Sequence, residues 1–266
     1  MNLRLVYKRF WWAVLFVVVG CRVEQGGPKM LDWEWRLETT DTTAVLAVWA
    51  GAHRAQELQW LRGVQRVRLK LHLPDGQLLE PLELVPTLSG MADRSGEQTS
   101  LALHAKVSLQ STPARIPGRV WVQYEVETSA GTLRGSQWVE RQHRSGALLL
   151  LPDILVGNGG VEFRLRVRRV QEVEGEYFPS SERLRVEVFQ GVKRLWSSDA
   201  GVAFLQVIGA VEPVAVGMEH VYQYRWNGRL NTGQELSAGI YEVRLTLPAR
   251  PFAYGVTVPL YWRGLR

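Results

Sequence analysis

Apolar side chains recur at every second position of this chain, in short segments that end at turn residues. In VRLKLHL (67–73) aliphatic and basic residues alternate, and Pro-Asp-Gly (74–76) leads into QLLEPLELV (77–85). A β-strand places successive side chains on opposite faces of a sheet, so the pattern predicts a half-buried antiparallel hairpin. RVWVQYEVE (119–127) and TLRGSQWVE (132–140), joined through Ser-Ala-Gly, predict a second one.

The second half of the chain has the same period. VEFRLRVRRV (161–170), ERLRVEVFQG (182–191), GIYEVRLTL (239–247) and YGVTVPLYW (254–262) each predict a strand. AHRAQELQWLRG (52–63) is the one candidate helix. Many short strands separated by Gly, Pro or Asn turns predict an all-β fold.

Two immunoglobulin-like β-sandwich domains are expected, covering 31–146 and 147–266. With 46% apolar residues and 11 tryptophans, the chain has enough apolar side chains to form a hydrophobic core in each domain. The apolar run ALLLLPDILV (147–156) is predicted to be a buried strand pair or an inter-domain connector. GNGG (157–160) lacks the Lys-Ser/Thr of a phosphate loop and is predicted to be an inter-domain turn.

The first 20 residues have the composition of a secretory signal peptide. A basic start with three cations is followed by the ten-residue apolar run FWWAVLFVVV (10–19). A helix that spans a bilayer needs roughly 20 apolar residues, so a permanent transmembrane anchor is the weaker alternative. Removal of residues 1–20 leaves 29 basic against 26 acidic residues and a net charge of +3. That charge gives no argument for a nucleic-acid partner.

Cys21 is the only cysteine of the chain, so no second thiol is present to pair with it. The preceding Val18, Val19 and Gly20 complete a stretch that resembles the lipobox of bacterial lipoproteins. The resemblance implies cleavage before Cys21, a diacylglycerol on its thiol and anchoring in a membrane on the extracytoplasmic side, periplasmic or outer. An ordinary signal peptide with a chance cysteine is the alternative. Residues 21–30 then form the lipidated cysteine and a Gly- and Pro-containing tether.

Residues 161–247 resemble the BsuPI-type intracellular proteinase inhibitor family, which has a small immunoglobulin-like β-sandwich fold. YFPS (177–180) stands where that family has F-P-S-G, and LWS (195–197) where it has V-W-R-W-S. WNG (226–228) matches W-D-G, and ELSAGIYEV (235–243) matches L-P-A-G-x-Y-x-V. The last two elements also resemble immunoglobulin-like domains of flagellar hook-capping type. The resemblance covers about a third of the chain and implies a fold more than an activity.

The sequence contains few residue patterns that are typical of catalytic or metal-binding sites. The five histidines are scattered, without an H-x-H or H-x-x-x-H pair, and neither G-x-S-x-G nor S-x-x-K occurs. Glu174 and Glu176 are expected to solvate a polar loop. The aromatic residues of VYQYRW (221–226) are expected in the core, and Tyr241 resembles the tyrosine corner of β-sandwiches. We therefore expect no enzymatic activity, no metal and no cofactor besides the covalent lipid.

Two sets of residues are candidates for an interaction surface. Arg164, Arg166 and Arg168, with Arg169 next to them, predict either a solvated strand face or a basic patch for lipid head groups or an acidic partner. Pro179 stiffens the segment 172–181, and Trp196 begins the segment 196–201; either segment is a candidate inhibitory loop.

The leading hypothesis is a lipid-anchored cell-envelope protein that binds or scaffolds another envelope protein. The alternative is a proteinase inhibitor displayed at the envelope, and a glycan-acting enzyme is third.

Overall fold

The computed structural model describes residues 31–52, 55–74, 78–92, 98–157 and 159–264, which are about 60% strand and 5% helix. The all-β prediction is therefore confirmed. The strands of the first half are β1 (Asp32–Thr39), β2 (Ala44–Ala52), β3 (Val64–His72), β4 (Leu78–Leu84), β5 (Thr87–Ala92), β6 (Gln98–Ser108), β7 (Arg119–Thr128) and β8 (Gly131–Ser145). Those of the second half are β9 (Leu148–Gly157), β10 (Gly160–Arg169), β11 (Arg185–Gln190), β12 (Lys193–Ser197), β13 (Glu219–Trp226), β14 (Gly239–Leu247) and β15 (Tyr254–Trp262). The helices are α1 (Ala55–Arg62) and the 3-10 turn η1 (Pro113–Arg115). No helix of the described segments is long and apolar enough to cross a membrane.

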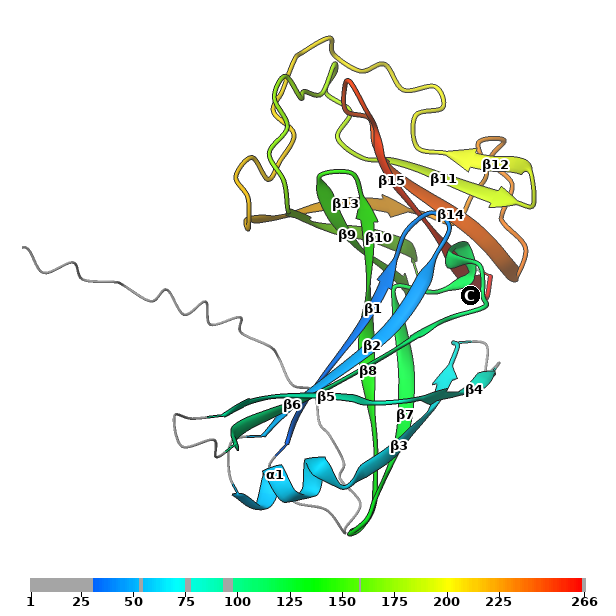
Figure 1. The fold of residues 1–266 in the computed structure, drawn as a ribbon. Coiled ribbons are helices and arrows are strands. Elements are labelled where there is room, and N and C mark those ends of the chain that lie inside the picture. Colours follow the sequence, from blue (N-terminus) through cyan, green and yellow to red (C-terminus); the bar gives the residue numbers. More distant parts are fainter. Residues whose placement is uncertain (1–30, 53–54, 75–77, 93–97, 158, 265–266) are drawn as a thin grey trace, which may run out of the picture.

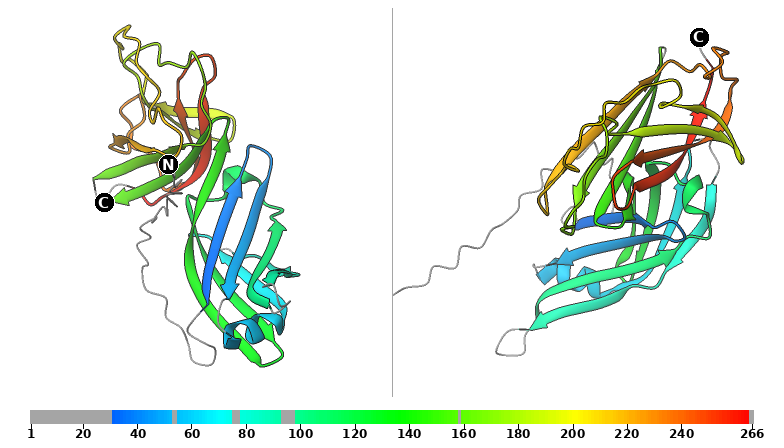
Figure 2. Two further views of the ribbon diagram at one scale, coloured as in Figure 1. Left: turned by 60° about the vertical axis from the view of Figure 1, so that its left-hand side comes forward. Right: turned by 90° about the horizontal axis from the view of Figure 1, so that it is seen from above.

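Two sheets contain all of these strands. The larger has the order β13-β10-β9-β8-β1-β2-β6-β5, with β7, β3 and β4 branching from β8. The smaller has the order β12-β11-β14-β15. Figure 1 shows β9 to β15 gathered in the upper part of the molecule and α1, β3 and β4 in the lower part. Both views in Figure 2 show the same separation of the blue-to-green half from the yellow-to-red half.

Buried apolar side chains form two clusters. One runs from Trp35 to Val139 and includes Leu58 and Leu61, which α1 turns inward. The other runs from Ala147 to Trp262 and fills the space between β9, β10, β13 and the smaller sheet. The described chain therefore has two separate cores, one on each side of the segment 140–146. The assignment of two immunoglobulin-like domains to them stays a prediction.

The two predicted hairpins are both present. β3 pairs with β4 in antiparallel register from Val67 opposite Leu84, and β7 pairs with β8 from Arg119 opposite Glu140 to Thr128 opposite Gly131. The inward positions of these strands are the aliphatic ones, since Val67, Leu69 and Leu71 are at most 1% exposed. The period-two pattern thus located both the strands and their buried faces.

The predictions for the segment 147–160 were wrong in detail. The run 148–157 is one continuous strand, β9, and not a strand pair. Pro152 fits inside it because β8 pairs only with Leu148–Leu150, which leaves no ladder partner on that edge at Pro152. The GNGG turn joins β9 to β10 as a hairpin inside the second half, so it is no inter-domain turn.

β8 connects the two cores without a break. Its first ten residues pair with β7, and its last residues pair with β1 in parallel and with β9 in antiparallel register. Arg141 and His143, 1% and 2% exposed, lie in phase with the buried Val139. The Arg141 guanidinium donates to Thr39 Oγ1 (2.9 Å) and to the carbonyls of Ile116 (2.6 Å) and Thr257 (3.0 Å). One buried cation thereby joins β1, the η1 segment and β15.

Candidate functional site

The end of strand β10 places a charged side chain where the core is expected. Val161, Phe163, Leu165 and Val167 face inward, and Arg169 continues this row at 2% exposure. The sequence analysis grouped Arg169 with the outward arginines, which was wrong. Its position two residues after Val167 was the signal, because side chains two apart in a strand share a face.

Arg169 fastens the loop between β12 and β13 to the sheet. Its guanidinium donates to the carbonyls of Val211 (3.1 Å) and Pro213 and, over 3.4 Å, to that of Gln171. Its backbone pairs with the far end of the same loop, through Arg169 N to Met218 O at 3.1 Å. Gly217 N donates in turn to Arg169 O at 2.8 Å. Four hydrogen bonds between Arg169 and this loop therefore fix its path, although the loop has no regular secondary structure.

The charge of Arg169 is balanced by Glu176, whose Oε2 accepts from Nη2 at 2.5 Å. The Glu176 side chain is only 5% exposed, so the expectation that it solvates a loop was wrong. The phenol of Tyr254 lies beside this carboxylate, and its pKa is raised first by burial and then by Glu176. The second oxygen, Glu176 Oε1, is buried and accepts no hydrogen bond.

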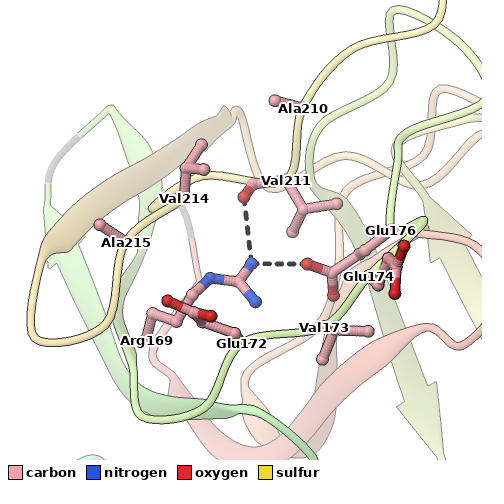
Figure 3. Close-up of a pocket in the computed structure, with 9 residues that line it drawn as sticks. All are labelled: Arg169, Glu172, Val173, Glu174, Glu176, Ala210, Val211, Val214 and Ala215. Atoms are coloured by element: carbon pink, nitrogen blue, oxygen red, sulfur yellow. Dashed lines mark hydrogen bonds and ion pairs between the residues drawn. The ribbon is translucent and has the colours of Figure 1, made fainter.

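A pocket of about 650 Å³ opens above this ion pair. Figure 3 shows the Arg169 guanidinium and the Glu176 carboxylate facing each other at its centre, with small apolar side chains around them. The apolar lining comes from Val173 on one loop and from Ala210, Val211, Val214 and Ala215 on the β12–β13 loop. Glu172 and Glu174, both exposed residues, complete the lining with two further carboxylates.

The β12–β13 loop (198–218) carries a concentration of exposed apolar side chains. Among the described residues 17 large hydrophobic side chains are exposed, and seven of these lie between 202 and 218. They are Val202, Leu205, Val207, Ile208, Val214, Val216 and Met218. The loop crosses the top of the molecule in Figure 1, at the end opposite α1. We call the pocket together with these seven residues the loop face.

The backbone of the loop face is pinned to the neighbouring segment 177–181. Phe178 and Gly209 exchange two backbone hydrogen bonds of 2.7 and 3.1 Å, and the Phe178 ring is fully buried. Ser181 N donates to Leu205 O at 2.8 Å, while Leu205 N donates to Ser181 Oγ at 3.0 Å. Leu205 is nevertheless 70% exposed. An apolar side chain is therefore presented to solvent on a fixed backbone.

The three arginines proposed as a basic patch point outward on β10, and each has an acidic partner. Arg164 pairs with Glu162 (2.7 Å), Arg166 with Glu140 (2.5 Å) and Arg168 with Glu219 (3.7 Å). All three arginine side chains are about two-fifths exposed. This geometry fits the solvated-face alternative, since the adjacent carboxylates compensate the positive charge.

The remaining candidates lie apart from that patch. Pro179 is half-buried and follows Phe178, whose backbone pairs with Gly209 of the β12–β13 loop. Trp196 is 7% exposed, and its ring lies 5.0 Å from that of Trp226 in the core. It offers no surface to a partner, so its assignment as an interaction residue is corrected. Cys21 and the lipobox residues Val18, Val19 and Gly20 lie outside the described residues, as does the signal peptide.

Two sequence-based expectations about aromatic residues agree with the structure. Tyr222 and Trp226 are 6% and 4% exposed in the second core, and Tyr224 is partly buried and packs against it. The Tyr241 hydroxyl donates to the carbonyl of Ser237 at 2.9 Å, which is the tyrosine-corner contact. In the described part of the chain no three His, Cys, Asp or Glu side chains are grouped so that they could hold a metal ion.

No family model and no curated protein matches the chain. Among solved structures it is similar to a DUF4785 family protein from Legionella pneumophila, at 15% identity and a TM-score of 0.28, over 87% of this chain and 55% of that one. Dimeric latent PorU from Porphyromonas gingivalis matches at 9% identity and a TM-score of 0.28, over 92% and 20%. The chicken interferon gamma receptor alpha chain matches at 8% identity and a TM-score of 0.23, over 86% and 97%. The chain thus spans about half of the first structure and a fifth of the second. These scores are too low for any of the three to bear on function.

Proposed function

We propose that this chain is a lipid-anchored cell-envelope protein that binds another envelope component through the loop face, without catalysing a reaction. One observation carries the proposal, the seven exposed apolar side chains between 202 and 218. Exposed apolar side chains that are concentrated in one part of a protein surface mark interaction sites, and these seven lie within 17 consecutive residues of one loop. Loops held by a rigid β scaffold are also where binding residues concentrate.

The anchor is the second part of the proposal and rests on the lipobox resemblance at Cys21. Cysteine acylation with two chains gives stable membrane attachment. The tether would then carry two β-sandwich domains, the second related to the BsuPI-type fold. Intact-mass measurement of the protein purified from membranes tests this part, because an unmodified chain starting at Met1 would refute it.

A photo-crosslinking amino acid placed at Ile208, 74% exposed, tests the loop face in intact envelopes. Val192, which is fully exposed on the β11–β12 turn, is the matched control position. A discrete adduct from 208 and none from 192 is expected, and Leu205→Asp should abolish it. Equal labelling from both positions, or no adduct at all, would contradict the proposal.

The second candidate function, an envelope-displayed proteinase inhibitor, is favoured by the fixed backbone at Leu205. Inhibitory loops present a side chain on a stiff, extended segment, and Leu205 is exposed while both its N–H and its C=O are hydrogen-bonded. The mature protein would then inhibit a protease that cleaves after large apolar residues, with loss of inhibition in Leu205→Asp. Undiminished activity of every serine and cysteine protease in a panel would eliminate this candidate.

A further inference from the structure

We propose that strand β13, at the edge of the larger sheet, pairs with β13 of a second copy of this chain in antiparallel register. The two copies of Tyr222 would lie opposite each other, on the two-fold axis of the dimer. This inference goes beyond the proposed function, because β13 (Glu219–Trp226) follows the loop face in the sequence and shares no residue with it.

The outer side of β13 is open and regular. β13, labelled in Figure 1, is the end strand of the larger sheet and, among the described strands, pairs only with β10. Its eight residues include neither proline nor glycine, and its pairing with β10 runs from Glu219 to Trp226 without a register shift. Such an edge strand presents a row of unpaired N–H and C=O groups, which is a template for one more strand.

The other edges of the two described sheets are less suited to pairing between chains. β4 and β15 each contain a proline, which lacks the N–H group that a ladder requires. The pairing of β5 shifts register near the end of the strand, and β12 has only five residues and begins with Lys193. Prolines, bulges, short edges and lysines are the devices that prevent edge pairing, and β13 has none of them.

The hydrogen bonds of β10 show which backbone groups of β13 face the open side. Arg169 N donates to Met218 O, and Arg169 O accepts from Gly217 N, so the main chain of Arg169 points toward β13. Backbone direction alternates along a strand, so every second residue of β10 from 161 to 169 points the same way. Their partners, which therefore bond to β10, are His220, Tyr222, Tyr224 and Trp226. The N–H and C=O groups at the open side of β13 are those of Glu219, Val221, Gln223 and Arg225.

This alternation restricts the register of a two-fold pair. An outward-pointing residue can exchange hydrogen bonds only with an outward-pointing residue of the second copy. With the axis at Tyr222, Glu219 lies opposite Arg225 of the second copy, and Val221 lies opposite Gln223. All four outward-pointing residues of each copy are then paired. Moving the axis to Val221 or Gln223 would take Glu219 and Arg225 away from each other.

The charges of the outer face fit the same register. Glu219 already lies beside Arg168 of β10 at 3.7 Å, and Arg225 lies opposite Glu162 of β10. The dimer would therefore carry rows of alternating charge across four strands: Arg168 and Glu219 of one copy, then Arg225 and Glu162 of the second. Opposite charges across strands are stabilising and like charges are destabilising. A patch that complements itself in this way is what a two-fold interface requires.

Charge reversal with a rescue tests the pairing. The full chain is purified in detergent, and its mass is followed by sedimentation equilibrium in density-matched detergent from about 1 µM to about 1 mM. We expect a reversible dimer for the wild-type chain. Glu219→Arg and Arg225→Glu should each weaken it about 10- to 100-fold, since each puts like charges opposite each other at both ends of the ladder. An equimolar mixture of the two variants should restore the dimer, because opposite charges then meet again, and so should the double variant.

Two further variants separate the edge from effects on folding. Gln223→Pro removes an N–H group that faces the open side and makes no bond to β10, so it should abolish the dimer while the urea midpoint of the chain changes little. Glu242→Arg, a charge reversal at an exposed position of β14, is the matched control and should leave the association unchanged. A wild-type chain that stays monomeric over the whole range would overturn the proposal. So would a dimer that resists Gln223→Pro, or single variants that fail to associate when they are mixed.

Discussion

The replacement Arg141→Met is expected to destabilise the folded protein by about 3 kcal/mol, although residue 141 touches no candidate site. The methionine side chain fills much of the same space but provides no donor. Three acceptors lose their hydrogen bonds, namely Thr39 Oγ1 and the carbonyls of Ile116 and Thr257. These groups belong to three segments that are far apart in the sequence.

The magnitude follows from two opposing contributions. Hydrogen bonds from a charged donor contribute about 1.5–3 kcal/mol each, so three of them contribute roughly 4–9 kcal/mol. Burial of the guanidinium acts in the other direction, because it lowers the pKa of Arg141 from 12.5 to about 10, which corresponds to about 3 kcal/mol. The difference leaves a net loss of roughly 1–6 kcal/mol, with a central value of about 3.

Urea unfolding followed by tryptophan fluorescence measures the effect, because both cores contain tryptophans. The matched control is Arg144→Met, on the same strand, where an exposed arginine donates to the carbonyl of Gly146. That variant should cost less than about 0.5 kcal/mol. We also expect the urea unfolding transition of Arg141→Met to be broader than that of the wild-type protein, or to split into two. The reason is that the lost guanidinium binds acceptors in both halves of the chain. Equal urea midpoints for the two variants would refute the conclusion that the buried Arg141 guanidinium stabilises the contact between the two halves.

Three further predictions concern stability. Burial and the charge of Arg141 lower the pKa of His143 from 6.5 to about 4, although exposed Asp41 faces its Nε2 at 3.4 Å. The unfolded chain therefore binds the proton first, so stability present above pH 6.5 falls by about 3 kcal/mol as the pH drops to 4. Urea midpoints across this range should change less in His143→Gln, and parallel curves would contradict the assignment. Tyr241→Phe removes one buried hydrogen bond and should cost about 1 kcal/mol in the same assay, with an unchanged midpoint as the contrary result. Gly160→Ala should lower the melting temperature by several degrees, since the residue has φ +132° and an added Cβ would lie 2.1 Å from the carbonyl oxygen of Trp226, the ladder partner of the next residue, Val161. An unchanged melting temperature in this variant would contradict the prediction, because it would show that β10 can move away from β13 at little cost in stability.

The strands were predictable from the sequence because their information is local. Alternation in 67–73 and 119–127 specifies both the strand and its buried face, and the turns between strands carry their own residue signals. The tyrosine corner at Tyr241 was predictable for the same reason, since its acceptor lies four residues earlier.

The charged residues inside the fold were not predictable in this way. Arg141, His143 and Arg169 lie in phase with apolar neighbours, which was a usable signal, but a charge is buried only where partners exist. Those partners come from distant segments, such as Thr257 for Arg141 and Val211 for Arg169. The pocket depends on the same long-range contacts. The sequence indicated that the acidic residues of the pocket lie in a polar loop. It did not indicate that this loop lies beside the apolar segment 210–215.

The continuity of β8 determines where this molecule can be cut. A fragment that begins at Ala147 would leave the backbone of Leu148–Leu150 without the strand that now pairs with it. Such an uncovered apolar edge is a template for pairing between chains, so the isolated second half is expected to aggregate. A fragment that stops at Ser145 would retain the Arg141 cation but lose its acceptor on β15. Each half therefore contributes a part that the other needs in order to remain soluble and folded, and the natural unit for expression contains both halves.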